Sequence, residues 1–292
     1  MNDHTEEQHF MTHISSEHRL LDLHIRETTH YRDLIFLLVK KNFTTNYKQT
    51  VLGPLWALIN PLLTTIVFTI VFGNLAGLAT TDTAGDYIIP KFLFYMSGNI
   101  CWGFFSTVLA STSRTFLDNR QTMGKVYYPR LVMPVATALS KLISFSIQFA
   151  MFAGFWLFYV IVGGTSIRPT WWILCIPLLV LQMMILATGL GIIVSSVTTK
   201  YRDLSMLVGF GLNLWRYGCP IAYGLLLVPQ KYMTVYMLNP MTPVLTAFRR
   251  AAFGFGYFHT GYYILSWIVT LILFFIGLIM FSRIERTFVD TI

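Results

Sequence analysis

Charged side chains are scarce in this chain of 292 residues. Asp, Glu, Lys and Arg together make up 12% of it, whereas 55% of the residues are hydrophobic. A soluble domain carries about 25% charged residues, so this chain has too few charges to cover a surface that faces water. The composition therefore predicts an integral membrane protein.

Motifs for nucleotide binding and hydrolysis are also missing. The chain contains no G-x-x-x-x-G-K-[ST] phosphate loop, since Gly124-Lys125 is followed by Val126, and neither G-x-S-x-G nor H-E-x-x-H occurs. The long apolar runs hold no Asp or Glu, which argues against the carboxylate relay of a proton-coupled carrier. We therefore expect the source of energy on another chain and no cofactor on this one.

Cysteine is rare, and Cys101, Cys175 and Cys219 lie in apolar segments without C-x-x-C spacing. They predict neither a disulfide framework nor a metal site. Most histidines lie in residues 1–30, where His9 and His13 stand four apart; a polar tail explains this pair as well as a helical metal site does. We expect 1–30 to be a flexible cytoplasmic tail without a cleavable signal peptide, so that the first apolar run directs the chain to the membrane.

The apolar residues form long uninterrupted runs. A helix needs about 20 apolar residues to cross a hydrocarbon core about 30 Å thick. By this measure the sequence predicts an all-α integral membrane protein with six transmembrane helices, at about 52–76, 90–112, 132–162, 171–197, 204–228 and 261–281.

Lysine and arginine set the expected orientation. If both termini are cytoplasmic, the cytoplasmic segments hold fourteen of these residues and the external segments five, as the positive-inside rule requires. Lys91, at the edge of the second predicted span, is counted as external, and the remaining two, Lys141 and Arg216, lie well inside predicted spans. The basic residues form no continuous stripe, so we expect no binding to nucleic acid.

Two segments fit neither a span nor a loop. Residues 31–49 place apolar residues on one helical side and basic residues around the other, which predicts an amphipathic helix in the cytoplasmic interface; the alternative is that they begin the first span. Residues 231–255 are apolar but broken by Asn239-Pro240 and Pro243, which predicts short re-entrant helices between spans five and six. A surface loop is the alternative for 231–255.

Several stretches occur together in one order: YKQTVLGPLWALINPLL (47–63), FLDNRQTMGKVYYPRLVMP (116–134), KYRDL (200–204), YGCPIAYG (217–224), LNPMTPVLTAFRRAAFG (238–254) and RTFVDTI (286–292). Together they make the chain resemble the membrane subunit of type-two ATP-binding-cassette exporters for lipid-linked polysaccharides. That family includes O-antigen, capsule and teichoic acid exporters.

The resemblance implies that residues 31–292 form one permease domain in the cell inner membrane. It also implies a homodimer with two ATPase subunits, which carry ATP and Mg, and a lipid-linked polysaccharide as substrate. In such a protein the helix 31–49 is a gate helix, beside which the carrier lipid enters from among the membrane lipids. Lys48 and Gln49 at its end are then candidate contacts for the lipid phosphate; the alternative for Lys48 is snorkelling to anionic lipids.

The resemblance further implies that the loops 114–130 and 200–203 couple the permease to the ATPase. Thr122-Met123-Gly124 departs from the bulky apolar and basic run of the family, and a plain topology loop is the alternative. The candidate coupling residues are Asn119, Lys125, Tyr127, Tyr128, Pro129, Arg130, Tyr201, Arg202 and Asp203.

Arg216 is the most unusual residue of the predicted spans. An arginine at a helix centre costs about 2.5–3.5 kcal/mol on insertion scales, so it is expected to face protein or a wet path rather than lipid. Aromatic faces stack on the C–H patches of sugars, and a guanidinium binds hydroxyl or acidic groups. The candidate glycan path consists of Trp56, Phe68, Phe72, Tyr95, Trp102, Phe104, Phe105, Trp215, Arg216, Tyr217 and Tyr223; the alternative is that these rings merely pack and that Arg216 has a structural role.

Three other functions compete with polysaccharide export. A type-two permease for a small hydrophobic substrate, such as a drug or haem, has similar architecture. A membrane-embedded enzyme that modifies glycans would need acids near the spans, where only Asp82 and Asp86 precede the last span on the external side. A purely structural membrane protein would not need the coupling-loop patterns.

Overall fold

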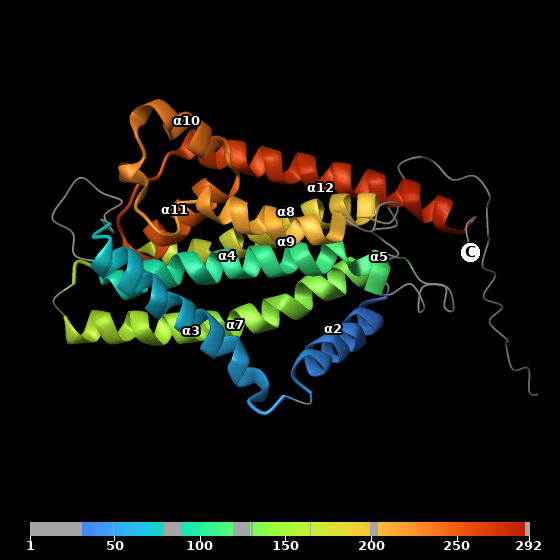
Figure 1. Cartoon of the computed structure of the whole chain (residues 1–292), viewed down its shortest axis with the longest axis horizontal. Coiled ribbons are helices and arrows are strands. Elements are labelled where there is room, and N and C mark those ends of the chain that lie inside the picture. The colour runs from blue at the N-terminus through green and yellow to red at the C-terminus, as the bar shows by residue number, and fades with distance from the viewer. Residues whose placement is uncertain are drawn as a thin grey trace, which may run out of the picture.

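A computed structural model describes residues 31–48, 50–78, 89–118, 129, 131–163, 165–198 and 204–289. In these residues the chain is helical and contains no strand. Most of the long helices run along one axis of the molecule, and α2 lies apart at one end (Figure 1). The expected all-α class is therefore confirmed for the described residues.

The helices of the described residues follow one another along the chain. Their bounds are α2 Arg32–Tyr47, η1 Gly53–Leu55, α3 Trp56–Phe68, the π-helix η2 Thr69–Leu75, α4 Lys91–Ser113, α5 Thr115–Asp118, α7 Val132–Val162, η3 Trp171–Cys175, α8 Ile176–Thr198, α9 Leu204–Tyr217, η4 Leu225–Leu227, α10 Gln230–Leu238, α11 Met241–Phe253 and α12 Thr260–Val289.

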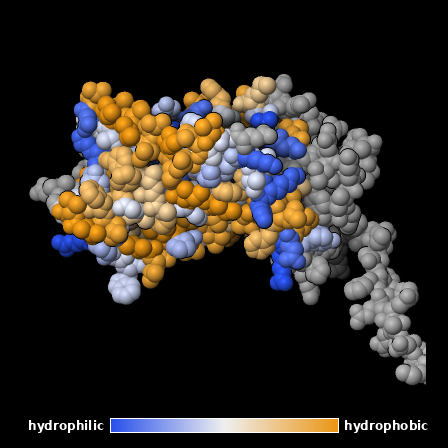
Figure 2. Space-filling view, turned by 90° about the horizontal axis from the view of Figure 1, so that it is seen from below, coloured by the Kyte–Doolittle hydropathy of each residue, from blue (hydrophilic) through white to orange (hydrophobic). Residues whose placement is uncertain are grey.

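Five stretches of the described residues are long and apolar enough to cross a membrane. They are Gly53–Leu75, Lys91–Ser113, Val132–Val162, Trp171–Thr198 and Thr260–Ser282, and they correspond to the first four predicted spans and the sixth. Apolar side chains cover most of the face seen in Figure 2, and hydrophilic ones gather towards its two ends. The chain is a multi-pass membrane protein.

The segment expected to form the fifth span, 204–228, is not one continuous helix. Helix α9 has 14 residues, about 21 Å at 1.5 Å per residue, and ends at Tyr217. Pro220 lacks the N–H that a continuing helix requires, and the next residues form turns and the short helix η4. Six continuous spans are therefore not confirmed.

Helix α4 is the centre of the bundle, with almost all of its residues from Leu93 to Leu109 buried. Small residues let its neighbours approach closely, as in other membrane bundles. A Cβ on Gly191 of α8 would lie 2.6 Å from Cβ of Thr112, and a Cβ on Gly277 of α12 would lie 2.7 Å from the carbonyl oxygen of Gly189 on α8. Backbone contact thus joins α4, α8 and α12.

Helix α2 packs on the beginning of α7. Leu38 and Val39 are buried against Val132, Met133 and Ala136, whereas Lys40, Lys41 and Lys48 are exposed. Phe36 and Leu37 are exposed as well, with 73% and 62% of their surface, so the exposed side of α2 carries both apolar and basic residues. An amphipathic helix in the membrane interface therefore stays a prediction.

Helices α10 and α11 form a pair of short helices at the end of the molecule opposite α2 and α5 (Figure 1). The chain breaks between them at Asn239-Pro240. All residues of α11 except Arg250 are buried, Arg249 among them with 1% of its surface exposed. The predicted break is confirmed, and whether the pair enters the membrane from outside stays a prediction.

Candidate substrate site between α2, α3, α4, α7 and α9

A cavity of about 600 Å³ lies among these five helices, within the range of about 300–1,000 Å³ that ligand sites occupy. Its walls combine indole rings, side-chain amides, hydroxyls and two basic groups. The lining residues are Asn46, Tyr47, Trp56, Ala57, Asn60, Pro61, Thr64, Asn99, Trp102, Gly103, Phe104, Ser106, Thr107, Ala110, Lys141, Ser144, Phe145, Gln148, Gly209, Leu212, Asn213 and Arg216.

Arg216 reaches the cavity from the last turn of α9 and is held by α4 and α3. Its Nη2 donates to Oδ1 of Asn99 at 2.7 Å, and its guanidinium lies 4.6 Å from the centre of the Phe68 ring, a cation–π contact. Asn99 in turn donates from Nδ2 to Oγ1 of Thr65 at 3.3 Å. The basic group is therefore oriented by the protein before any ligand arrives.

The second basic group is Lys141, which belongs to α7 and lines the same cavity. Ser144 and Gln148 follow it at three and seven residues, so all three lie on one helical face. Tyr47, near the end of α2, is hydrogen-bonded through its hydroxyl to Oγ of Ser144 at 3.1 Å. This bond ties the end of α2 to the wall of the cavity.

The structure brings four of the predicted path residues to the cavity: Trp56, Trp102, Phe104 and Arg216. Of these, Trp56 is the accessible ring, with 40% of its surface exposed, whereas Trp102 has 5% exposed and Phe104 2%. Among the predicted path rings that line the cavity, Trp56 is therefore the one with a large exposed surface, and its stacking on a glycan stays a prediction.

The other predicted path residues lie behind or beyond the cavity. Tyr95 and Phe105 are buried in the core with Phe68 and Phe72 packed beside it. Trp215 makes edge contacts to Trp102 and Phe105, with ring centres 6.1 and 5.2 Å apart. Tyr217 is exposed, and Tyr223 is hydrogen-bonded to Tyr236 and to the Tyr217 carbonyl. Their place in a glycan path stays a prediction.

Sequence reasoning did not assign Lys141 and the amides Asn46, Asn60, Asn99, Asn213 and Gln148 to the site. One signal was present: Lys141 and Arg216 are the two basic residues well inside the predicted spans. The amides come from α2, α3, α4, α7 and α9, and only the packing of these helices shows that they line one cavity.

The predicted lipid-contact and coupling residues fall largely outside the described residues. Lys48 is exposed directly after α2, and Pro129 is buried and accepts a hydrogen bond from the Val132 N–H at 3.0 Å. The candidates Gln49, Asn119, Lys125, Tyr127, Tyr128, Arg130, Tyr201, Arg202 and Asp203 lie outside the part of the chain that the structure describes.

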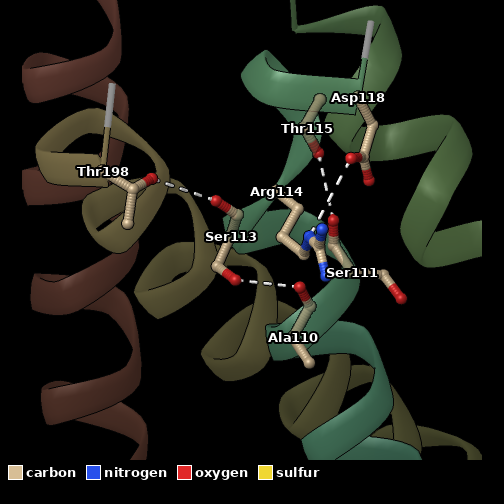
Figure 3. A network of polar contacts seen from close by, with 7 residues as sticks. All are labelled: Ala110, Ser111, Ser113, Arg114, Thr115, Asp118 and Thr198. Carbon is tan, nitrogen blue, oxygen red and sulfur yellow. Dashed lines mark hydrogen bonds and ion pairs between the residues drawn. The ribbon is translucent and has the colours of Figure 1, made fainter. Parts of the chain in front are cut away.

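The helix ends from which both predicted coupling loops depart are joined, as Figure 3 shows. The Thr198 hydroxyl at the end of α8 donates to the Ser113 carbonyl at the end of α4 at 3.3 Å. Arg114 and Asp118, on either side of the start of α5, pair at 3.9 Å with both side chains largely exposed. The helix ends that precede the two loops are therefore joined by a hydrogen bond.

The described residues form a bundle of apolar helices with a cavity that holds polar and basic side chains, and the sequence comparison gives the class of protein. Residues 33–253 match the ABC-2 type transporter family, which is more than half of the chain. The chain therefore belongs to the ABC-2 type transporter family and is a transporter protein rather than an enzyme.

Similar proteins include the O-antigen export system permease protein RfbA of Klebsiella pneumoniae. It is 26% identical over 260 residues, which cover 88% of this chain and 94% of that protein. A protein of the same name from Myxococcus xanthus is 27% identical over 230 residues, covering 77% of this chain and 82% of its own length. The resemblance found in the sequence motifs is confirmed at the level of the family.

Proposed function

We propose that this chain is the membrane subunit of an ATP-driven exporter for a lipid-linked polysaccharide of the O-antigen type. Two copies work with two ATPase subunits in the inner membrane, and both termini are cytoplasmic. The single observation that carries the choice of substrate is the lining of the cavity, which pairs indole rings with amides and basic groups. Rings that stack on sugars and amides that bind hydroxyls are the usual recognition chemistry of glycans.

The motifs of the chain indicate which subunit of the exporter binds ATP. It has no phosphate loop, so ATP and Mg are bound by the partner subunits. The joined ends of α4 and α8 support a role for the loops 114–130 and 200–203 in receiving the motion of the ATPase. The aromatic path, with Trp215, Tyr217 and Tyr223 towards the external end, continues the route of the glycan, and Lys48 and Gln49 bind the phosphate of its lipid.

The competing functions fit the cavity less well. Most of the accessible lining of the recess is apolar, as a small hydrophobic substrate would also require, but five amides and two basic groups in the same lining favour a substrate with hydroxyl or acidic groups. An enzyme that modifies glycans would need an acid or a base at the reacting bond, and no Asp or Glu is among the lining residues.

The test uses the full chain purified with its ATPase and reconstituted in proteoliposomes. We expect the lipid-linked glycan to stimulate ATP turnover, and Trp56→Ala to lower this stimulation and the export by about threefold to tenfold, because one stacking face is lost. Trp171→Ala is the matched control, since Trp171 has 86% of its surface exposed and does not line the cavity.

Two experimental results would contradict the proposed function. A chain that binds no ATPase, or a complex whose ATP turnover rises with a hydrophobic drug and not with the glycan, would overturn it.

A further inference from the structure

The cavity holds two basic groups and no acid. Lys141 and Arg216 both line it, from α7 and α9, while no Asp or Glu does so. The ion pairs found among the described residues join Arg32 to Asp33 and Arg114 to Asp118, and neither involves the cavity. Two positive charges next to apolar spans are unfavourable unless an anion accompanies them, so the charge of this recess is not balanced from within the described part of the chain.

Arg216 lines the cavity, and its guanidinium is only partly hydrogen-bonded within the described residues. A guanidinium has five N–H donors in a planar fork, and one of its nitrogens, Nη2, is bound to Asn99. Its Nε is buried and has no hydrogen-bond partner among the described residues. A buried donor without a partner is costly, and the oxygen atoms of a carboxylate or phosphate match the fork. The contacts to Asn99 and Phe68 hold the fork in place without neutralising it.

Lys141 supplies the second charge from α7. It lies nine residues into α7, about 14 Å along the helix from Val132, and is partly buried. No hydrogen bond or ion pair to its ammonium group is present within the described residues. Its neighbours on the same face of α7, Ser144 and Gln148, are polar and also line the cavity.

From these observations we propose that the cavity is an anion-binding site, in which Lys141 and Arg216 together bind a carboxylate or phosphate group of the exported molecule. This proposal rests on the proposed export of a lipid-linked glycan. It limits the substrates of that export to molecules that place an acidic group in the cavity. Trp56 and the amides then bind the sugar that adjoins the acid. The acid has two sources, the pyrophosphate of the lipid carrier or an acidic sugar of the glycan.

The closing experiment measures binding to the full chain in complex with its ATPase, in nanodiscs of neutral lipid. The probes are a polyprenyl pyrophosphate without sugar, an oligosaccharide that contains a uronic acid, and a neutral oligosaccharide of equal length. We expect at least one acidic probe to bind about tenfold more tightly than the neutral one. Tighter binding of the pyrophosphate identifies the lipid carrier as the source of the acid, and tighter binding of the uronic acid identifies the glycan.

Substitutions at Lys141 test whether the tighter binding of the acidic probe takes place in this cavity. Lys141→Gln should weaken binding of the acidic probe about tenfold and leave the neutral probe unchanged, while Lys141→Arg should retain acidic binding. Lys231→Gln is the matched control, because Lys231 is exposed on α10 and away from the cavity. The thermal midpoint of each variant shows that it is folded, and Lys141→Gln removes a charge from an apolar helix without removing a hydrogen bond.

Equal binding of acidic and neutral probes, or unchanged acidic binding in Lys141→Gln, would overturn the anion site. The proposed function fails separately. ATP turnover that is stimulated by the lipid-linked glycan, together with equal binding of the acidic and neutral probes, preserves the exporter and rejects the anion site. A complex that does not form with any ATPase rejects the exporter itself.

Discussion

Asn239 shows how one side chain can replace the hydrogen bonds of an interrupted helix. Its Oδ1 accepts from the indole of Trp215 at 3.1 Å and from the N–H of Met241 at 3.2 Å. Its Nδ2 donates to the Gly218 carbonyl at 3.0 Å and lies 3.2 Å from Sγ of Cys219. The amide thus joins the end of α9 to the start of α11, where neither helix can satisfy these groups.

The first prediction at this scale concerns Asn239→Ala. The change leaves the partly buried Trp215 indole and Gly218 carbonyl without partners, which costs up to about 1–3 kcal/mol for each group. We expect the apparent thermal midpoint in detergent to fall by roughly 5 °C or more. Gln230→Ala, an exposed amide at the start of α10, is the control and should leave the midpoint unchanged. A midpoint for Asn239→Ala equal to that of the control would show that water replaces the amide.

At the scale of the element, the contact between α8 and α12 depends on glycine for space rather than for backbone conformation. A Cβ on Gly189 would lie 2.7 Å from the Cα of Phe274, and a Cβ on Gly277 equally close to the Gly189 carbonyl oxygen. These contacts involve backbone atoms, which cannot rotate away as a side chain can. The two helices must therefore separate if either glycine gains a methyl group.

Gly277→Ala is accordingly expected to destabilise the protein by about 1–3 kcal/mol, the usual cost of overpacking. Gly154→Ala on α7 is the matched control, since a Cβ there meets nothing within 4 Å and alanine favours a helix over glycine. Thermal unfolding of both variants in the same detergent measures the difference. Equal midpoints for the two variants would mean that α8 and α12 adjust their spacing freely.

At the scale of the whole molecule, the proposed orientation places α2 and α5 on the cytoplasmic side and α10 on the external side. The orientation can be tested by replacing either Lys40 or Lys231, both of which are exposed, with a single cysteine. The native cysteines of the chain are replaced beforehand. An impermeant maleimide should label Lys231→Cys in right-side-out vesicles and Lys40→Cys only in inverted ones. Labelling of Lys40→Cys from the external side would reverse the orientation.

The sequence predicted the parts of the fold that depend on local patterns. Uninterrupted apolar runs identified the first four spans and the sixth, and Asn239-Pro240 identified the break between α10 and α11. The early end of α9 was missed although Pro220 marks it in the sequence. The apolar run continues past this proline, and it does not reveal that Asn239, 21 residues further on, will satisfy the Gly218 carbonyl. Lys141 was missed for the same reason: the sequence does not show which helices surround it.

One consequence concerns the backbone that follows α9. Under the proposed topology, α9 covers about 21 Å of a hydrocarbon core about 30 Å thick, and the buried turn Cys219–Ala222 continues the crossing. The carbonyl of Ile221 in that turn accepts a hydrogen bond from Nη2 of Arg249 at 3.2 Å. In the same way, the Asn239 amide donates to the carbonyl of Gly218. Newly made chains without these two side chains would leave peptide carbonyls without partners at membrane depth, so we expect quality-control proteases to remove them before assembly.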